Sequence, residues 1–181
     1  MDYRNTITVK QYVSPIGCIL LGSVQDSLVL CDWQTDTHSQ KIKKRLEQIL
    51  SATYREGTSG VIEAAQSQLE EYFSGKRQNF DLHLALVGSD FQKTVWKALL
   101  SIPYGETVSY AALARIIGKP KAVRAVANAN NANALSVVIP CHRVIGSNRT
   151  LTGYGGGLDI KLKLLELETR HSLYNLHENR T

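Results

Sequence analysis

Three side chains that could do chemistry together follow one another in the sequence, at Cys141, His142 and Arg143. A cysteine reacts as its thiolate, and a reference pKa of about 8.5 leaves only a few per cent of that form at neutral pH. A histidine beside it can accept the proton, and an arginine adds positive potential that favours the anion. The triplet therefore indicates a nucleophilic cysteine. It is also compatible with a structural cysteine beside a core histidine, so the rest of the chain has to decide.

The residues before the triplet indicate how the thiol is held. Residues 135–139 are uncharged and rich in β-branched side chains, which predicts a short buried strand. Pro140 keeps the preceding residue extended and cannot donate a ladder hydrogen bond, so the strand is expected to end there. We therefore expect Cys141 directly after a rigid strand end.

The charge distribution points to a polyanion as the partner. The formal net charge is +5, and no acidic residue occurs between Glu106 and Asp159. Lysine and arginine on one surface displace the counterions of phosphates, which is the sequence-independent part of nucleic-acid binding. The alternative is an ordinary solvated basic face. Cys141 lies in the same window as the basic residues Arg115, Lys119, Lys121, Arg124, Arg143 and Arg149.

Composition sets the class of protein. The 181 residues are 43% hydrophobic and 20% charged, which is ordinary for a globular protein of one large or two small domains. The N-terminus lacks the apolar stretch of a signal peptide, and no run is long enough for a membrane span, so we predict a cytoplasmic protein. The three cysteines form no close pair. A zinc site built from Cys18, Cys31 and a histidine such as His38 or His83 is the less favoured alternative, because the spacing fits no compact template.

The first half of the chain predicts an α+β domain over residues 1–80, followed by a linker at residues 81–89. Short β-prone runs predict an antiparallel meander, with a turn at residues 14–17. Apolar residues at helical spacing then predict two amphipathic helices. The predicted strands lie at residues 6–9, 18–21 and 28–31, and the helices at residues 41–50 and 60–74.

The second half predicts a mainly helical domain over residues 90–170, with a polar tail at residues 171–181. A helix is expected to begin at Ser89 or Asp90, and a second one begins at the cap Ser109 and stops at Gly118. A third helix, at residues 121–130, completes a helix-turn-helix pattern. This third helix is almost entirely of small residues around Arg124, which suits insertion into a narrow groove. A glycine cluster at residues 152–157 and a helix at residues 159–168 follow.

These motifs in this order resemble the O6-alkylguanine-DNA alkyltransferase family, also called methylated-DNA-protein-cysteine methyltransferases. The resemblance is carried by PCHRVIG at residues 140–146, by KAVRAV at residues 121–126 and by TGYGGG at residues 152–157, together with Tyr110, Asn133 and Glu168. It is densest over residues 90–168. The family's fold is α+β. It combines a small N-terminal α/β domain, ribonuclease H-like with a short antiparallel sheet, and a helical C-terminal domain with a winged helix-turn-helix.

The resemblance implies a reaction and a role for each matching residue. Members of the family move the alkyl group from O6 of guanine, and possibly O4 of thymine, to their own cysteine, once and irreversibly. Cys141 is the implied acceptor, His142 its base acting through a water, Glu168 the carboxylate that orients His142, and Tyr110 the donor to guanine N3. Arg124 is implied to enter the minor groove and fill the gap left by the flipped nucleotide. Four more residues are implied to contact DNA, in addition to Arg124 and Tyr110: Lys121, Ala125, Ala129 and Arg143. The residues implied to line or support the substrate pocket are Asn133, Val144, Tyr154, Gly155 and Gly156.

The implied partner is double-stranded DNA that contains O6-alkylguanine, bound by a monomer without cofactor, metal or membrane. Two departures stand out: Ala134 where relatives carry proline, and Gly155 where some carry serine. The zinc ligands of some relatives have no counterpart near Arg4 and Ser23. Two alternatives remain open at this point: a lesion sensor that binds DNA without chemistry, and a Cys-His-Glu hydrolase. Cys141 argues against the sensor, and the acid-free basic window against the hydrolase.

Overall fold

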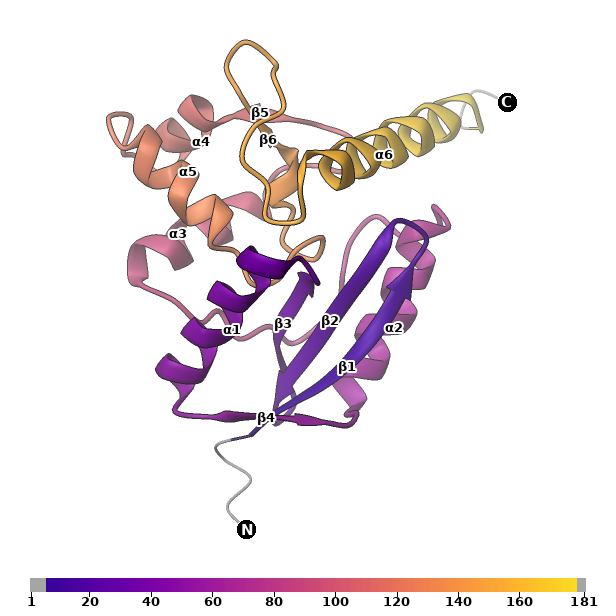
Figure 1. The fold of residues 1–181 in the computed structure, drawn as a ribbon. Coiled ribbons are helices and arrows are strands. Elements are labelled where there is room, and N and C mark those ends of the chain that lie inside the picture. The colour runs from indigo at the N-terminus through magenta and orange to yellow at the C-terminus, as the bar shows by residue number, and fades with distance from the viewer. Residues whose placement is uncertain (1–5, 179–181) are drawn as a thin grey trace. The chain divides into compact units, whose positions relative to one another are not determined.

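The structure, a computed structural model, describes residues 6–178 (Figure 1). The chain divides into two compact units. One comprises the residues up to Ser89 together with Ala134–Val138, and the other comprises Asp90–Asn133 and the residues from Ile139 onward. The five residues 134–138 therefore group with the first unit, although we predicted residues 90–170 as one continuous domain.

The first unit is built on a mixed four-stranded sheet of order β3-β2-β1-β4. The three predicted strands are confirmed and form an antiparallel meander. A fourth strand was not predicted, because its sequence TYRE is largely exposed and lacks an apolar alternation. It pairs in parallel with β1, so the sheet is mixed: the predicted antiparallel meander supplies three of its strands and β4 adds a parallel edge. The strands are β1 (Thr6–Ser14), β2 (Gly17–Val24), β3 (Ser27–Trp33) and β4 (Thr53–Glu56).

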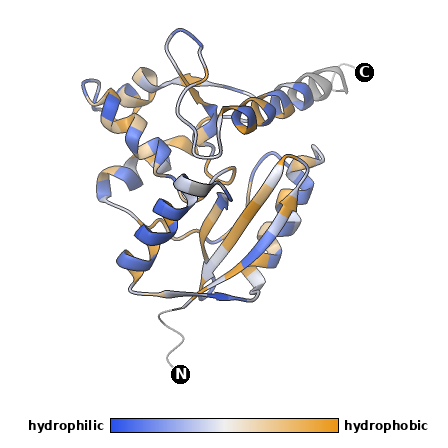
Figure 2. Ribbon diagram, viewed as in Figure 1, coloured by the Kyte–Doolittle hydropathy of each residue, from blue (hydrophilic) through white to orange (hydrophobic). Residues whose placement is uncertain are grey.

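Two helices cover opposite faces of this sheet, α1 (Asp36–Leu50) and α2 (Gly60–Phe73) (Figure 1). Ile42 and Leu46 of α1 pack into one apolar cluster with Ile7 and Val9 of β1. The outer side of α1 is hydrophilic, whereas β2 is hydrophobic over most of its length (Figure 2). Both predicted helices are confirmed, and their amphipathic pattern is explained by this layering.

The linker predicted at residues 81–89 is tied to the sheet. Leu28 donates its backbone N–H to the carbonyl of His83, and Ala85 donates back to the carbonyl of Leu28. This pairing continues the sheet beyond its last regular strand.

The second unit is helical, with one short parallel strand pair. Ser109 caps α4 as predicted, because its hydroxyl accepts the N–H of Ala112 at 3.1 Å. Gly118 follows the end of α4 at a φ of +70°, the conformation that glycine adopts most easily. The elements are α3 (Asp90–Leu99), β5 (Val108–Ser109), α4 (Tyr110–Ile116), α5 (Val123–Asn131), the 3-10 helix η2 (Cys141–Arg143), β6 (Val144–Ile145) and α6 (Leu158–Glu178).

The strand predicted at residues 135–139 does not form. Leu135 makes an isolated parallel bridge with Cys31, and the chain then turns, with the N–H of Val138 bonded to the carbonyl of Ser136 at 2.9 Å. Val137 has a φ of +70°, which is incompatible with an extended strand. The residues are buried and β-branched as expected, but burial here holds a turn rather than a strand.

The last helix is longer than predicted. α6 continues past Glu168 to Glu178, so residues 171–178 of the predicted polar tail have a helical backbone. Residues 179–181 lie outside the described residues. None of the helices in residues 6–178 has the length and apolar composition that a membrane span requires.

Candidate active site

Cys141 opens η2 with its side chain 4% exposed. The side-chain amide of Asn133 donates to Cys141 Sγ at 3.1 Å and to the carbonyl of Ile139 at 2.9 Å. One asparagine therefore holds both the sulfur and the backbone that presents it. A donor aimed at sulfur stabilises the thiolate more than the thiol.

The imidazole of His142 is completely buried and is oriented by a carboxylate. Its Nε2 lies 2.7 Å from Glu168 Oε1, whereas its Nδ1 has no hydrogen-bond partner within the described residues. A carboxylate at Nε2 favours the tautomer with the proton on that nitrogen, which leaves the Nδ1 lone pair available as a base. Burial lowers the pKa of His142, and this outweighs the opposite effect of Glu168. A neutral imidazole is the form that can accept a proton.

Glu168 is shared between His142 and Arg143. Arg143 donates through Nε to Oε2 at 2.9 Å and through Nη2 to Oε1 at 3.0 Å, and the N–H of Gly105 adds a bond at 3.1 Å. Burial alone would raise the pKa of Glu168, but the hydrogen bonds and charges of His142 and Arg143 hold it well below its usual range. Glu168 is therefore an anion with every oxygen occupied.

Arg143 has a different place from the one we predicted. We predicted a DNA contact, but Arg143 is only 6% exposed and its Nη1 donates to the carbonyl of Ile102 at 2.6 Å. The ring of Tyr104 lies 5.6 Å from the guanidinium carbon. With Glu168 as its counter-ion, Arg143 supports the carboxylate, and we no longer assign it to DNA.

Lys161 is a fully buried cation that sequence reasoning missed. Its Nζ donates to the carbonyl of Val144 at 2.6 Å and to that of Thr152 at 2.7 Å. Burial lowers the pKa of Lys161 to about 8, and the charge of Cys141 acts in the opposite direction. The spacing of Lys161, Leu164 and Glu168 could have indicated this burial, because residues at these intervals share one face of a helix. All three are buried on α6.

Tyr110 begins α4 and reaches the glycine-rich loop. Its hydroxyl lies 3.1 Å from the carbonyl of Thr152 and 3.3 Å from that of Gly153, to which it can donate. The pKa of Tyr110 is raised, mainly by burial and also by the charge of Cys141. Hydrogen bonds with Thr152 and Asn130 act in the opposite direction. The phenol therefore carries its proton at neutral pH.

The loop residues predicted to line a pocket directly follow the two residues that contact the Tyr110 hydroxyl, Thr152 and Gly153. Tyr154 and Gly156 are buried and Gly155 is partly buried. Gly153 has a φ of +52°, and a Cβ at this position would lie 3.3 Å from the Tyr110 hydroxyl. Glycine therefore lets the loop backbone approach the phenol closely.

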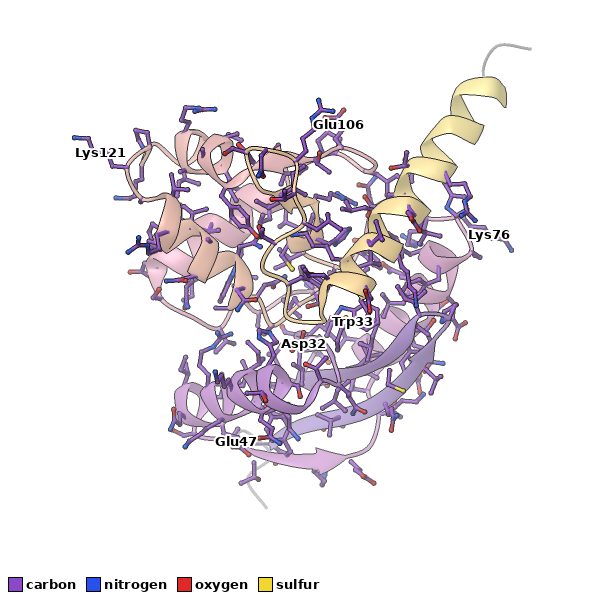
Figure 3. The ribbon with its side chains drawn as sticks, turned by 45° about the horizontal axis from the view of Figure 1, so that its top comes forward. Asp32, Trp33, Glu47, Lys76, Glu106 and Lys121 are labelled. Carbon is purple, nitrogen blue, oxygen red and sulfur yellow. The ribbon has the colours of Figure 1, made fainter. Side chains whose placement is uncertain are left out.

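The helix predicted to contact DNA has one exposed and one buried face. Arg124, Ala125 and the preceding Lys121 are exposed, and Lys121 projects away from the ribbon at the edge of the view (Figure 3). Ala129 is only 3% exposed and its carbonyl accepts the indole N–H of Trp96 at 2.8 Å. Ala129 therefore belongs to the packing of α5 on α3, and we no longer assign it to DNA.

Within residues 6–178, no group of three or more histidine, cysteine, aspartate or glutamate side chains is arranged to hold a metal ion. The ionisable side chains of the site instead bind one another: Glu168 is hydrogen-bonded to both His142 and Arg143, and we call these three residues the Glu168 network.

Two family descriptions match the chain. Residues 90–170 match "6-O-methylguanine DNA methyltransferase, DNA binding domain". Residues 7–86 match "6-O-methylguanine DNA methyltransferase, ribonuclease-like domain". Together the matches span both units of the structure.

Named relatives and solved structures agree with these matches. A methylated-DNA-protein-cysteine methyltransferase of Methanosarcina barkeri is 54% identical over 155 residues, which cover 86% of this chain and 92% of that protein. The crystal structure of the Mycobacterium tuberculosis O6-methylguanine methyltransferase is 42% identical, with a TM-score of 0.77, and the match covers 91% of this chain and 94% of that one. A structure of the same Mycobacterium tuberculosis protein in complex with DNA is 40% identical, with a TM-score of 0.76, and the match covers 92% and 94% of the two chains.

Proposed function

Since the chain belongs to the 6-O-methylguanine DNA methyltransferase family, we propose that it repairs DNA by moving the alkyl group of an O6-alkylated guanine to its own Cys141. The observation that carries the assignment is the buried array around the thiol. Asn133 holds the sulfur at 3.1 Å, and His142 is bound to Glu168 through Nε2 while its Nδ1 has no partner within the described residues. The predicted roles of the individual residues are part of this proposal.

Activation of the thiol uses the neutral imidazole. The proton of Cys141 passes to His142 Nδ1, through a bridging water as the family resemblance implies. Glu168, held as an anion by Arg143, stabilises the resulting imidazolium. This is the logic of a nucleophile, base and orienting carboxylate applied to cysteine. The Asn133 amide and the Lys161 ammonium favour the thiolate.

Transfer forms one bond and breaks another. Cys141 Sγ attacks the alkyl carbon, the bond from that carbon to O6 breaks, and its electron pair stays on the purine. Tyr110 donates a proton to N3 of the leaving purine, which departs as guanine. The thioether on Cys141 has no hydrolytic exit, so each protein molecule reacts once.

DNA is recognised by the exposed face of α5. Because a base stacked in a duplex cannot reach a buried thiol, the guanine has to be extruded, which costs a few kcal/mol. We assign Arg124 to the space left by the extruded nucleotide, with Lys121 and Ala125 beside the backbone. We expect a monomer without cofactor or metal, located with the DNA in the cytoplasm.

The test is the intact mass of the protein after incubation with duplex DNA containing one O6-methylguanine. We expect the mass to rise by one methylene equivalent, on the tryptic peptide that contains Cys141. Cys141→Ser should show no shift, whereas Cys18→Ser, which removes a partly exposed thiol of the first unit, should react like the wild type. An unchanged wild-type mass, as expected of a hydrolase or a lesion sensor, would overturn the proposal.

A further inference from the structure

The turn that follows α3 contacts the Glu168 network. It is closed by a hydrogen bond from the N–H of Glu106 to the carbonyl of Pro103 at 3.2 Å, which leaves Tyr104 and Gly105 at its two central positions. Gly105 has a φ of +77°, a conformation that glycine adopts most easily. The turn therefore presents an aromatic ring and a backbone N–H from adjacent residues.

This segment binds both charges of the ion pair between Arg143 and Glu168. The carbonyl of Ile102, just before the turn, accepts Nη1 of Arg143 at 2.6 Å. The N–H of Gly105 donates to Glu168 Oε2 at 3.1 Å. The ring of Tyr104 adds a third contact, with its centroid 5.6 Å from the guanidinium carbon of Arg143. An acceptor thus meets the cation, a donor meets the anion, and a ring lies against the guanidinium.

The ring restricts a movement of Arg143 that the hydrogen bonds leave comparatively free. Nε and Nη2 donate to Glu168, and Nη1 donates to the carbonyl of Ile102. Because the guanidinium is planar, all of these N–H groups point outward in one plane. Bonds in that plane fix the position of the group but resist tilting less well. The Tyr104 ring, which also attracts the cation through its quadrupole, opposes the tilt.

The hydroxyl of Tyr104 contributes less than the ring. It lies 3.4 Å from Nδ1 of His171, about one turn beyond Glu168 on α6, and this distance is long for a hydrogen bond. Burial raises the pKa of Tyr104 to about 12, with the charge of Glu168 acting in the same direction and that of Arg143 against it. The phenol is therefore neutral in the range around pH 8.5, roughly where cysteines titrate.

We propose that Tyr104 is a positioning residue for alkyl transfer. Its ring keeps Arg143 in the plane in which both oxygens of Glu168 receive an N–H. Glu168, held in this way, orients the imidazole of His142 through Nε2. The inference rests on the proposed function, which assigns the proton of Cys141 to Nδ1 of that imidazole. In this role Tyr104 acts through Arg143 and not on the reacting atoms.

The first measurement is the single-turnover rate of benzyl transfer from O6-benzylguanine to Cys141, followed by intact mass. Tyr104→Leu removes the ring and should slow transfer by about tenfold, because small misplacements of a catalytic group have large effects on rate. Tyr104→Met, which also lacks a ring, takes its place if the leucine variant does not fold. Tyr104→Phe keeps the ring and loses only the long hydroxyl contact, so it should stay within about twofold of the wild type.

The second measurement separates positioning from packing. The rate of iodoacetamide alkylation is followed against pH on the tryptic peptide that contains Cys141. In Tyr104→Leu we expect the midpoint of this profile to move to higher pH, because a misaligned Glu168 stabilises the imidazolium of His142 less well. Adding Tyr104→Leu to Glu168→Gln should slow benzyl transfer little further, because residues that act through one another are not additive.

The matched control is Tyr54→Leu, in β4 of the first unit. Tyr54 is also partly buried, and a cation lies over its ring, with Nζ of Lys43 5.0 Å from the ring centroid. This variant loses the same kind of contact outside the site, so its transfer rate and its alkylation midpoint should match the wild type. Urea unfolding of both leucine variants shows how much stability each has lost.

Three results would overturn the inference while leaving the proposed function intact. One is a Tyr104→Leu protein with the wild-type rate and midpoint. Another is a Tyr104→Phe protein as slow as Tyr104→Leu, which would assign the effect to the hydroxyl and its contact with His171. The third is full additivity of Tyr104→Leu and Glu168→Gln. A wild type that transfers no benzyl group to Cys141 would instead overturn the proposed function, and the inference with it.

Discussion

The Glu168 carboxylate connects the chemistry of the site to the stability of the fold. Its two oxygens receive His142, two nitrogens of Arg143 and the N–H of Gly105, and none of the three charged or ionisable side chains is appreciably exposed. A buried ion pair adds little when it is compared with an apolar replacement, but removing one partner leaves an uncompensated charge. Glu168 is therefore expected to be sensitive to substitution in both respects.

Glu168→Gln should lower the free energy of unfolding by about 3–5 kcal/mol, because the Arg143 guanidinium keeps its burial and loses its counter-ion. It should also slow iodoacetamide alkylation of Cys141, because a neutral amide does not stabilise the imidazolium of His142. Urea unfolding and the alkylation rate measure the two effects.

The control for this change is Glu71→Gln. Glu71 and Arg77 form an ion pair at 2.6 Å in which both side chains are partly exposed. Pairs of that kind contribute about 1 kcal/mol or less, so Glu71→Gln should be nearly neutral. Equal destabilisation by the two substitutions would show that burial of the Glu168 network has no energetic consequence.

At the scale of elements, α5 performs two tasks on two faces. Val126 and Ala129 are buried and pack the helix into the second unit, whereas Arg124 and Ala125 are exposed. Small side chains let the helix pack closely on one side, and on the other side they suit the close approach of DNA that we propose. Between Val123 and Asn128, Arg124 is the only long side chain on the exposed face of α5. We therefore expect α5 to act on DNA mainly through Arg124.

Arg124→Ala should slow alkyl transfer from O6-methylguanine in duplex DNA by about tenfold or more, because extrusion of the base loses its support. Transfer from free O6-benzylguanine needs no extrusion and should change little. Both rates are measured under single-turnover conditions.

Lys97→Ala is a suitable control, since it removes one exposed positive charge from α3 in the same unit. It should leave the ratio of the two rates at the wild-type value. If Arg124→Ala slowed both substrates equally, its role would lie in folding or in the site itself and not in base extrusion.

At the scale of the molecule, a buried carboxylate should make the stability of the first unit depend on pH. Asp32 of β3 is 2% exposed, and its Oδ1 accepts the hydroxyl of Ser136 at 2.9 Å. Burial raises the pKa of Asp32 to about 7, although Ser136, the N–H of Trp33 and the charge of Arg45 act against the shift. His38 also faces this carboxylate, with Nε2 at 3.9 Å from Oδ2, and burial lowers the pKa of His38.

The sign of the effect follows from linkage. The ordinary pKa of an aspartate is about 3.9, so between pH 4 and 7 the unfolded chain releases the Asp32 proton while the folded protein retains it. Stability should therefore fall as pH rises through this range and stay low above pH 7. Asp32→Asn should remove that component and should be more stable than the wild type at pH 8, by a few kcal/mol at most. The advantage should shrink towards pH 4.

Urea unfolding at pH 5 and pH 8 measures this difference. Asp26→Asn, in the exposed turn between β2 and β3, is the control and should follow the wild type at both pH values. A wild type and an Asp32→Asn protein with parallel pH profiles would contradict the prediction.

Much of this protein could be predicted from short stretches of sequence. The cap Ser109, the stop at Gly118 and the helical periodicity of α1 and α2 depend on residues within a few positions of one another. The motifs KAVRAV, PCHRVIG and TGYGGG, in this order along the chain, likewise indicated the family, which the comparisons confirm. Local structure of this kind can be predicted from the sequence because it depends on interactions between residues that are close together in the chain.

Only the tertiary structure decided which buried groups meet. The partner of Arg143 lies 25 residues away, and that of Trp96 lies 33 residues away, so neither was visible in the local pattern. Long-range packing also gave residues 135–139 a turn in place of the predicted strand. The same kind of packing buried Ala129 and Lys161. The sequence determined which functional groups are available, since these are properties of single residues and near neighbours. The fold determined their charge states and contacts, since desolvation and hydrogen bonding depend on segments that meet only when the chain is folded.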